Sequence, residues 1–511
     1  RDFVDGLRTN DVEVVTRMLL GDVVGKGASK SAESTMAGGA REKTATVGVH
    51  GVNGLGGLGK STIAQQVCAR VSAIRDRFQA GGMFWLQASA ENLVGESRKL
   101  VRDLLALHVP DADIDDAIKA CETVERTRAV AKQIFETRWP KRERSPVLIV
   151  LDDVWDGAIV DRVIPVDALP EGSAVLMTYR DRRIGKDAKV TSQHALSVLS
   201  EDASLKLLRD ACGKKAPREA ALRVAKRLGY HPMALKIAAR DVVRCEEDGD
   251  GACDATSSKV WLEYLDDLNA DIQDMALDDE EKVDDNEARR RHVSVFCSIA
   301  LSLRRLRGKG RRRGRHGAFD PETLRKKYRQ LAIFAEDATI PTMALTRVWE
   351  FAKASETEAC AGVFVQAGLL EKRVDGADGE YVSYRLHDLC RDYVRWRVEK
   401  EKGEGAVRAM QRSFVEWLAR EDWEEALTAD GDDRSRRVRA RAWERTFEAA
   451  VGMEVVSRSK AEPSEEGAKV VYEFSGLLTH FGRLVEAKEM AERSLEMDYA
   501  IYGTDKAHPE I

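Results

Sequence analysis

The chain has 511 residues, of which 43% are hydrophobic and 33% are charged, with 38 Gly and only 11 Pro. At roughly 100 to 200 residues per domain, this length predicts about three or four domains, each with its own core. The composition excludes the disordered, fibrous and membrane-embedded classes of protein. The formal net charge of −5 is too close to zero for a protein that binds polyanions with its whole surface, so nucleic acid is not an expected partner.

The cysteine pattern and the lack of long apolar runs in the sequence predict a cytoplasmic protein. Eight Cys are scattered without a Cys-x-x-Cys pair, which suits a reducing compartment. No apolar run approaches the ~18 residues of a spanning helix, and no basic then apolar leader opens the chain, so no membrane partner is expected. Because the chain begins at Arg1 rather than Met and ends inside a helical repeat pattern, we expect a piece of a longer protein.

The first two hundred residues predict a helix, a loop and then a parallel sheet. A short helical pattern ends near residue 22, and a stretch rich in Gly, Ser and Ala follows it. Apolar runs then alternate with helical segments, which is the pattern of a parallel sheet covered by helices. The expected strands are Val47–His50, Met83–Gln87, Val147–Leu151 and Ala174–Thr178.

The rest of the chain is predicted to be mainly helical. Ser200 is a candidate N-cap for the first of these helices. Two extended runs, Leu369–Val374 and Tyr381–Leu386, are joined by a Gly-containing turn and predict a β-hairpin. Helices that end in a hairpin indicate a winged helix, and the last residues read as one helical repeat. The fold class is therefore multidomain α/β plus α, divided as 1–43 N-terminal helix and loop, 44–198 parallel-sheet domain, 199–292 helical domain, 293–398 winged-helix domain with a basic insertion, 399–465 helical linker and 466–511 start of helical repeats.

A basic run lies inside the predicted winged-helix region, between Arg304 and Arg315. Such a run could bind nucleic acid or serve as a nuclear address. However, no aromatic residues are interleaved to stack on bases, and Asp278–Glu287 upstream is acidic. We therefore interpret the run as a solvated insertion after a helix over Val293–Leu303.

Residues Gly54–Ser61 read Gly-Leu-Gly-Gly-Leu-Gly-Lys-Ser and fit the phosphate loop G-x-x-x-x-G-K-[ST], between a predicted strand and a predicted helix. Glycines let the backbone curl so that its N–H groups and the helix N-terminus face phosphate oxygens. Lys60 would reach the β and γ phosphates, and the Ser61 hydroxyl would ligate Mg²⁺. The expected nucleotide-binding residues of this loop are Gly54, Gly56, Gly57, Leu58, Gly59, Lys60, Ser61 and Thr62.

The apolar run that precedes Asp152 and Asp153 predicts the metal side of the same site. Asp152, at the strand end, would hold Mg²⁺ through water. Asp153 would orient or deprotonate the attacking water. The alternative is a capping pair of carboxylates in a turn.

Several motifs occur in the order seen in the NB-ARC family, which comprises the STAND-class signalling NTPases of plant immune receptors and animal apoptotic-protease activators. Over roughly residues 1–398 the chain resembles that family, which implies that the sheet domain over 44–198 is a P-loop NTPase domain. Its last helix pair, within 466–511, resembles a tetratricopeptide repeat of the kinesin-light-chain type. The motifs are the phosphate loop with the following Thr-Ile-Ala, Leu151-Asp-Asp-Val-Trp155, Gly172-Ser-Ala-Val-Leu-Met-Thr-Tyr-Arg180, Leu199-Ser-Glu-Asp-Ala203, Gly229-Tyr-His-Pro232 and Leu386-His-Asp-Leu389.

The resemblance implies roles for three further residues. Arg180 would be the sensor arginine that reads the γ-phosphate and takes part in hydrolysis with Asp153 and Lys60. Pro232 would pack near adenine, although Tyr230 and His231 stand where the family usually has Gly-Leu. His387 would bond the β-phosphate of ADP from the winged helix. The alternatives are a surface arginine and a structural histidine.

The resemblance implies a switch, with ADP holding the domains closed and ATP favouring an open form that oligomerises. Slow ATP hydrolysis would reset it, with ATP or ADP and Mg²⁺ as cofactors. The C-terminal repeats would bind an unknown protein or ligand, and the signalling role would be immune or related to stress or cell death. Two alternatives stay open, a metabolic P-loop kinase and an ATP-dependent winged-helix transcription regulator that binds DNA. For the second, salt-dependent DNA binding is the test.

Overall fold

The computed structural model divides into two compact units, Arg1–Ala203 (unit 1) and Ser204–Ile511 (unit 2). The structure describes residues 6–21, 44–51, 56–88, 93–108, 114–119, 121, 123–138, 145–212, 216–247, 256–278, 287–306, 319–335, 338–375, 381–428, 433–456 and 463–502.

Unit 1 is built on a five-stranded sheet in the order β2-β3-β4-β1-β5, and every neighbouring pair of strands is parallel. The four predicted strands are confirmed. The fifth strand was not predicted because its sequence, Ser-Gln-His-Ala-Leu, lies at the sheet edge and only Leu196 in it is fully buried. The strands are β1 Ala45–Gly51, β2 Met83–Gln87, β3 Leu148–Val154, β4 Ala174–Tyr179 and β5 Ser192–Leu196.

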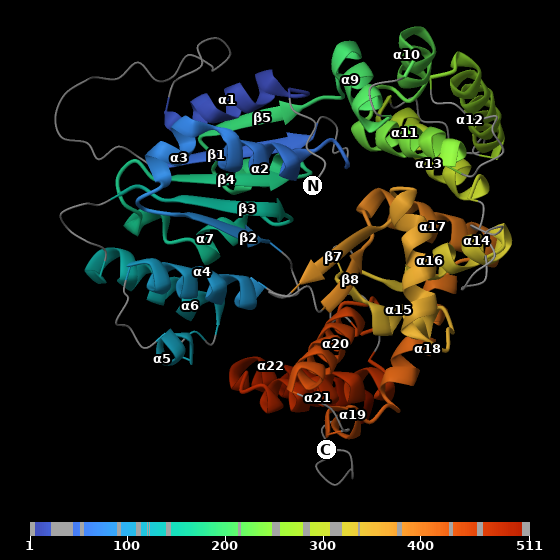
Figure 1. Ribbon diagram of the computed structural model, residues 1–511. Helices are drawn as coiled ribbons and strands as arrows, with labels where there is room; N and C mark the ends of the chain where they lie inside the picture. Colours follow the sequence, from blue (N-terminus) through green and yellow to red (C-terminus); the bar gives the residue numbers. More distant parts are fainter. Residues whose placement is uncertain are drawn as a thin grey trace. The chain divides into compact units, whose positions relative to one another are not determined.

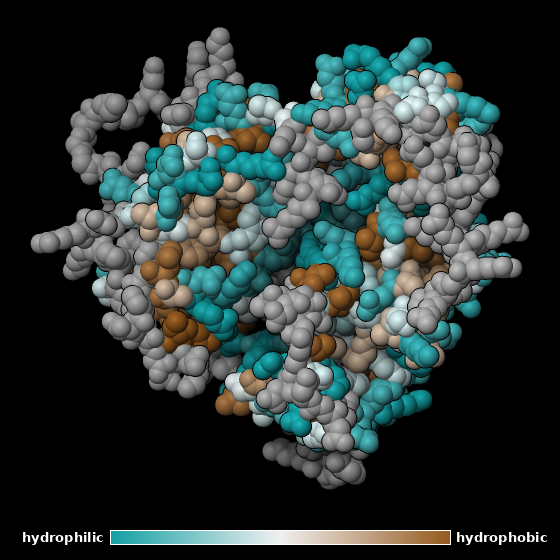
Figure 2. All heavy atoms as spheres, in the orientation of Figure 1, coloured by the Kyte–Doolittle hydropathy of each residue, from teal (hydrophilic) through white to brown (hydrophobic). Residues whose placement is uncertain are grey.

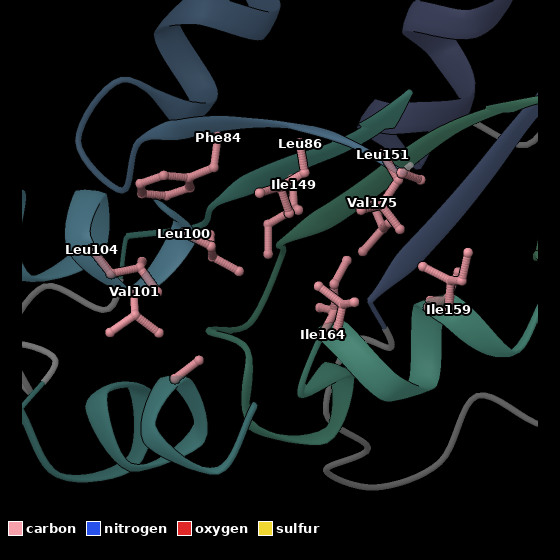
Figure 3. Packing of buried hydrophobic residues seen from close by; sticks show 14 of the residues in the cluster. Phe84, Leu86, Leu100, Val101, Leu104, Ile149, Leu151, Ile159, Ile164 and Val175 are labelled. Carbon is pink, nitrogen blue, oxygen red and sulfur yellow. The ribbon is translucent and has the colours of Figure 1, made fainter. Parts of the chain in front are cut away.

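Helices cover both faces of this sheet (Figure 1). On β3, Ile149 and Leu151 enter one core cluster whereas Leu148 and Val150 enter the other, as the two-residue period of a strand requires. Figure 3 shows the first cluster, in which side chains of β2 and β3 meet those of the helix over Leu93–His108. The helices are α1 Thr9–Leu20, α2 Lys60–Arg70 and α3 Ser72–Phe78 on one side, and α4 Leu93–His108, α6 Val124–Gln133 and α7 Ala158–Val163 on the other, with α5 Ile114–Lys119 and α8 Arg182–Asp187 completing the unit.

Strand β3 contains a bulge just before its end. Leu151 pairs with Met177 and Val154 pairs with Tyr179, so one extra residue of β3 is inserted against β4. Asp153 takes the left-handed backbone conformation with φ 59°. This conformation is uncommon outside glycine and is tolerated best by Asp and Asn.

Unit 2 begins with a helical bundle. Helix α13 packs on α11 and α12 and also contacts α14 and α17, so it touches helices on both sides of the boundary predicted at residue 293. Arg304 and Arg305 lie at its C-terminal end and pair with Asp271 and Asp267 of α12. Both therefore belong to the bundle rather than to an insertion as predicted, while the Arg304 side chain is still 47% exposed and that of Arg305 is 18% exposed; Arg307–Arg315 lie outside the described residues. The bundle helices are α9 Glu201–Ala211, α10 Arg218–Arg227, α11 Pro232–Glu247, α12 Ser258–Asp278 and α13 Glu287–Arg304.

The next part of unit 2 is four helices with a small antiparallel sheet in the order β6-β8-β7. The predicted hairpin is confirmed, since β7 and β8 pair from Glu371 with Arg385 to Asp375 with Tyr381. Buried aromatic rings of Tyr328 and Phe364 form the centre of its core. The elements are α14 Pro321–Gln330, β6 Ile340–Pro341, α15 Thr342–Val348, α16 Ala354–Gln366, β7 Glu371–Asp375, β8 Tyr381–Arg385 and α17 Asp388–Lys402.

The last part of unit 2 is helical, as predicted. Its final two helices pack along each other, with Gly482 at φ 70° in the turn between them and the Ser494 hydroxyl donating to the Ala468 carbonyl at 2.8 Å. The view in Figure 2 shows hydrophilic side chains over most of the surface, with small separate hydrophobic patches. Within the described ranges, no helix combines the length and hydropathy needed to cross a bilayer. These helices are α18 Ala406–Leu418, α19 Trp423–Thr428, α20 Asp433–Val451, α21 Glu465–His480 and α22 Leu484–Tyr502.

Candidate functional site

The predicted phosphate loop joins the carboxyl end of β1 to the N-terminus of α2. Gly57 and Gly59 have φ values of 65° and 93°, a left-handed backbone that glycine adopts without strain. Gly59 is the N-cap of α2, and its carbonyl accepts the N–H of Ile63 at 2.9 Å. Gly54 lies outside the described residues. The described part of the loop therefore curls tightly onto a helix N-terminus, which is a favourable place for an anion.

Lys60, Ser61 and Thr62 form the first turn of α2 directly after the loop. The Lys60 residue is 8% exposed, Ser61 is half-buried and Thr62 is exposed. A buried ammonium at the carboxyl edge of a parallel sheet is costly unless it faces negative charge. Leu58, in the loop itself, is fully buried and anchors the loop to the core.

One hydroxyl group contacts both of the predicted acidic residues. Thr178 is fully buried near the end of β4, and its Oγ1 donates to Oδ1 of Asp152 at 2.6 Å. The same Oγ1 accepts the backbone N–H of Asp153 at 2.8 Å. Nη2 of Arg180 lies 3.5 Å from Oδ2 of Asp153. The structure thus brings Asp152, Asp153 and Arg180 together at one edge of the sheet.

Positive charge gathers at the same edge, around His50 at the end of β1. His50 is buried and its ring stacks on Tyr179 at 5.7 Å between centroids. Burial lowers the pKa of His50, a hydrogen bond to the next backbone carbonyl opposes that shift, and charges on Arg182, His194 and Lys60 lower the pKa further. The imidazole is therefore held neutral in a field that would attract phosphate.

Pro232 and His387 belong to unit 2. Pro232 is the first residue of α11, where its fixed φ and missing N–H suit a helix start. His387 is exposed and is the N-cap of α17, and its Nδ1 accepts the N–H of Leu389 at 3.2 Å. Both residues therefore have a structural role in starting a helix.

The sequence reasoning missed Thr178 and Arg8. Thr178 lies two residues before Arg180 inside a motif already singled out, so its position next to the predicted carboxylates could have been inferred from parallel strand order. Arg8 had no signal of its own, because a lone arginine before a short helix is ordinarily a surface residue. Its side chain is only 9% exposed here.

The oxygen donors of Ser61 and Asp152 are of the type that Mg²⁺ prefers. Asp152 is 5% exposed, and its Oδ1 accepts the Thr178 hydroxyl, which fixes the carboxylate orientation. This donor set fits a magnesium ion bound beside a phosphate.

Comparisons with known proteins agree on the first part of the chain. Residues 39–217 match the family described as NB-ARC domain. The regulatory protein AfsR of Streptomyces coelicolor is 25% identical over 361 residues, which cover 70% of this chain and 30% of that protein. The disease resistance protein RPP8 of Arabidopsis thaliana is 24% identical over 365 residues, which cover 68% of this chain and 35% of that protein.

Among solved structures, a STAND protein with a tetratricopeptide repeat sensor from Pyrococcus horikoshii matches with 12% identity and a TM-score of 0.39, covering 88% of this chain and 56% of that one. The chain spans about a third of the length of the two curated relatives above.

Proposed function

We propose that this chain, whose residues 39–217 match the NB-ARC domain family, is a nucleotide-dependent signalling switch that binds ATP and ADP. The observation that carries the proposal is the phosphate loop, with two left-handed glycines leading into α2 and a buried Lys60 after them. A loop of this kind binds the phosphates of a nucleotide through backbone N–H groups and the lysine ammonium.

Hydrolysis would take place where β3 and β4 end. Asp152 and Ser61 would hold Mg²⁺, which when bound would offset charge on the phosphates. Asp153 would accept a proton from the attacking water. Its carboxylate lies 3.5 Å from the Arg180 guanidinium, so a γ-phosphate that attracts Arg180 would compete with Asp153 for the same charge. Recognition of the γ-phosphate by Arg180 and release of the Asp153 carboxylate from Arg180 would therefore be coupled. We expect a slow ATPase.

Unit 2 would complete the switch through Pro232 near adenine and His387 at the β-phosphate of ADP. Since Nδ1 of His387 already accepts a helix-capping bond, Nε2 is the ring nitrogen that would meet the phosphate. ADP would then favour the closed state, and ATP an open one that oligomerises, because each nucleotide binds the two states unequally. The helix pair α21 and α22 would start tetratricopeptide repeats that bind a protein or ligand. We place the protein in the cytoplasm and its signalling in immunity or stress.

A DNA-binding regulator is the second candidate, favoured by the likeness to a regulatory protein. In a winged helix, the helix before the hairpin would enter the DNA groove. Here that helix, α16, carries Glu356 and Glu358 and no Lys or Arg, so phosphates would repel it. DNA affinity that falls steeply with salt would support this candidate; we expect no such binding.

The switch proposal is tested by identifying the nucleotide that copurifies with the chain and by calorimetry. Lys60→Ala removes a charge-assisted phosphate bond worth about 1.5 to 3 kcal/mol, so ADP affinity should fall by about 10- to 150-fold. Lys99→Ala, at an exposed position of α4, is the matched control and should bind ADP like the parent. A Lys60→Ala protein with parental ADP affinity contradicts the assignment.

A further inference from the structure

Arg8 lies just before α1 and joins three segments of unit 1 that are far apart in the sequence. Its Nη2 donates to the Leu58 carbonyl at 2.9 Å and to the Ser197 carbonyl at 2.7 Å. Its Nη1 donates to Oδ2 of Asp11 at 2.9 Å. The first carbonyl belongs to the phosphate loop, and the second follows β5, so one guanidinium holds the loop to the end of the edge strand.

The bond to Leu58 has a geometric consequence for the next residue. In a trans peptide the C=O of one residue and the N–H of the following residue point in opposite directions, and the chain has no cis peptide in its described part. A Leu58 carbonyl fixed on Arg8 therefore aims the Gly59 N–H to the other side of the loop. The Gly59 carbonyl accepts the N–H of Ile63 of α2, so the N–H and the C=O of Gly59 both have a fixed direction.

The Arg8 side chain is itself held in place. The other oxygen of Asp11, Oδ1, lies 2.8 Å from Nε2 of His194 on β5. Burial raises the pKa of Asp11, but hydrogen bonds from His194 and Arg8 together with their charges outweigh burial and lower it. The carboxylate is thus ionised when it fixes the guanidinium, and Arg8 approaches the loop with its orientation already set.

We propose that Arg8 is a positioning residue of the phosphate loop, which orients the Gly59 N–H toward a phosphate of a bound nucleoside diphosphate. Arg8 acts from outside the loop through a backbone carbonyl and touches no ligand atom. The inference rests on the proposed function, because it requires that the loop bind phosphate. It adds a determinant outside the loop motif, from a helix that precedes the sheet.

The test replaces Arg8 by Met, which keeps an unbranched apolar stem and removes the donors of the side chain. ADP and pyrophosphate affinities are measured by calorimetry, and folding of the ligand-free protein is followed by circular dichroism. Both affinities should fall by about 10-fold, because both ligands would be bound by the Gly59 N–H that Arg8 orients. Arg17→Met, on the same helix with its exposed partner Glu13, is the matched control and should bind as the parent does.

Arg8→Lys separates positioning from general stability. A single ammonium cannot hold both carbonyls and Asp11 in the fork geometry of arginine, so about half of the affinity loss, on a logarithmic scale, should remain in a folded protein. If Arg8→Met does not fold, the lysine variant decides. Parental ADP affinity in a folded Arg8 variant, with Lys60→Ala still impaired, overturns the positioning role alone. A parent protein that binds neither ADP nor pyrophosphate overturns the proposed function and this inference with it.

Discussion

Thr178 gives the two carboxylates of the candidate site different surroundings. Its hydroxyl donates to the Asp152 side chain but accepts only from the backbone of Asp153. The Asp153 side chain instead faces the half-buried guanidinium of Arg180, at 3.5 Å. Asp152 is therefore oriented by a buried hydroxyl, as a metal-side ligand should be, whereas Asp153 can exchange partners when a phosphate arrives.

This difference predicts separate effects of two substitutions. Asp153→Asn should leave ATP and Mg²⁺ bound but slow turnover, by about 100-fold or more, because an amide cannot accept the proton. Asp152→Asn should weaken the effect of Mg²⁺ on ATP affinity. Single-turnover hydrolysis and calorimetry with and without Mg²⁺ measure the two effects. Parental turnover in Asp153→Asn together with complete loss in Asp152→Asn would reverse the assignment.

His50 predicts a dependence of stability on pH. Its folded pKa lies below the ordinary value of 6.5, so the unfolded chain binds this proton more tightly than the folded chain does. The stability contributed by the neutral ring is complete above the unfolded pKa and is lost as pH falls through the folded one. Melting temperatures of the parent and His50→Asn at pH 7.5 and pH 5.5 should show the larger drop in the parent. Equal drops would mean that other groups cause the acid sensitivity.

At the level of elements, the sheet of unit 1 could be predicted where its strands are apolar, including the edge strand β2, in which only Phe84 and Leu86 are buried. Strands β1 to β4 are apolar runs, and their positions follow from sequence alone. Strand β5 carries one buried residue and derives its place from pairing with β1, which no local pattern encodes. Similarly, Arg304 and Arg305 were assigned to an insertion because the carboxylates that pair with them come from α12, which lies earlier in the chain.

The contact between β4 and α8 predicts a steric effect. A Cβ on Gly185 of α8 would lie 2.1 Å from the Tyr179 hydroxyl oxygen. Gly185→Ala should therefore destabilise unit 1 by about 1 to 3 kcal/mol in urea unfolding. Tyr179→Phe in the same chain should restore part of this loss, because the closest atom is removed.

The matched control for this steric effect is Gly362→Ala in α16, where a Cβ would meet nothing within 4 Å. There the better helix propensity of Ala should leave stability unchanged or raise it by up to about 1 kcal/mol. A Gly185→Ala protein as stable as the parent would show that α8 shifts away at little cost.

For the whole molecule, the sequence motifs predicted the residues of the loop and of the candidate metal side, all of which lie in unit 1. The loop motif is local, so strand, glycines and Lys60 appear together in the sequence. The arrangement of Arg8, Thr178 and the carboxylates depends on which strands are neighbours, and this is a property of the folded sheet. The reach of His387 toward a nucleotide in unit 1 stays a prediction.

His387 is predicted to clamp ADP in the closed state. A hydrogen bond to a charged phosphate is worth about 1.5 to 3 kcal/mol, so His387→Ala should speed ADP release by about 10- to 150-fold. His387→Asn keeps a side-chain acceptor for the N-cap of α17 while removing Nε2. This variant therefore distinguishes loss of the bond to ADP from loss of the helix N-cap. Fast release of a fluorescent ADP analogue in both variants supports the clamp. Fast release in the Ala variant alone assigns the effect to the helix cap.

Asp153 is the extra residue that the bulge inserts into β3. Leu151 and Val154 belong to the same core cluster, although three steps along a regular strand would place them on opposite faces. The extra residue restores the phase of the strand, so two adjacent carboxylates fit between them without turning Val154 outward. Removing Asp153 altogether would leave a regular strand with the same inward side chains, whereas removing Val150 would invert those that follow. The packing of the core therefore does not depend on the second carboxylate, and a chain could gain or lose the candidate water-side carboxylate at this point while keeping its sheet intact.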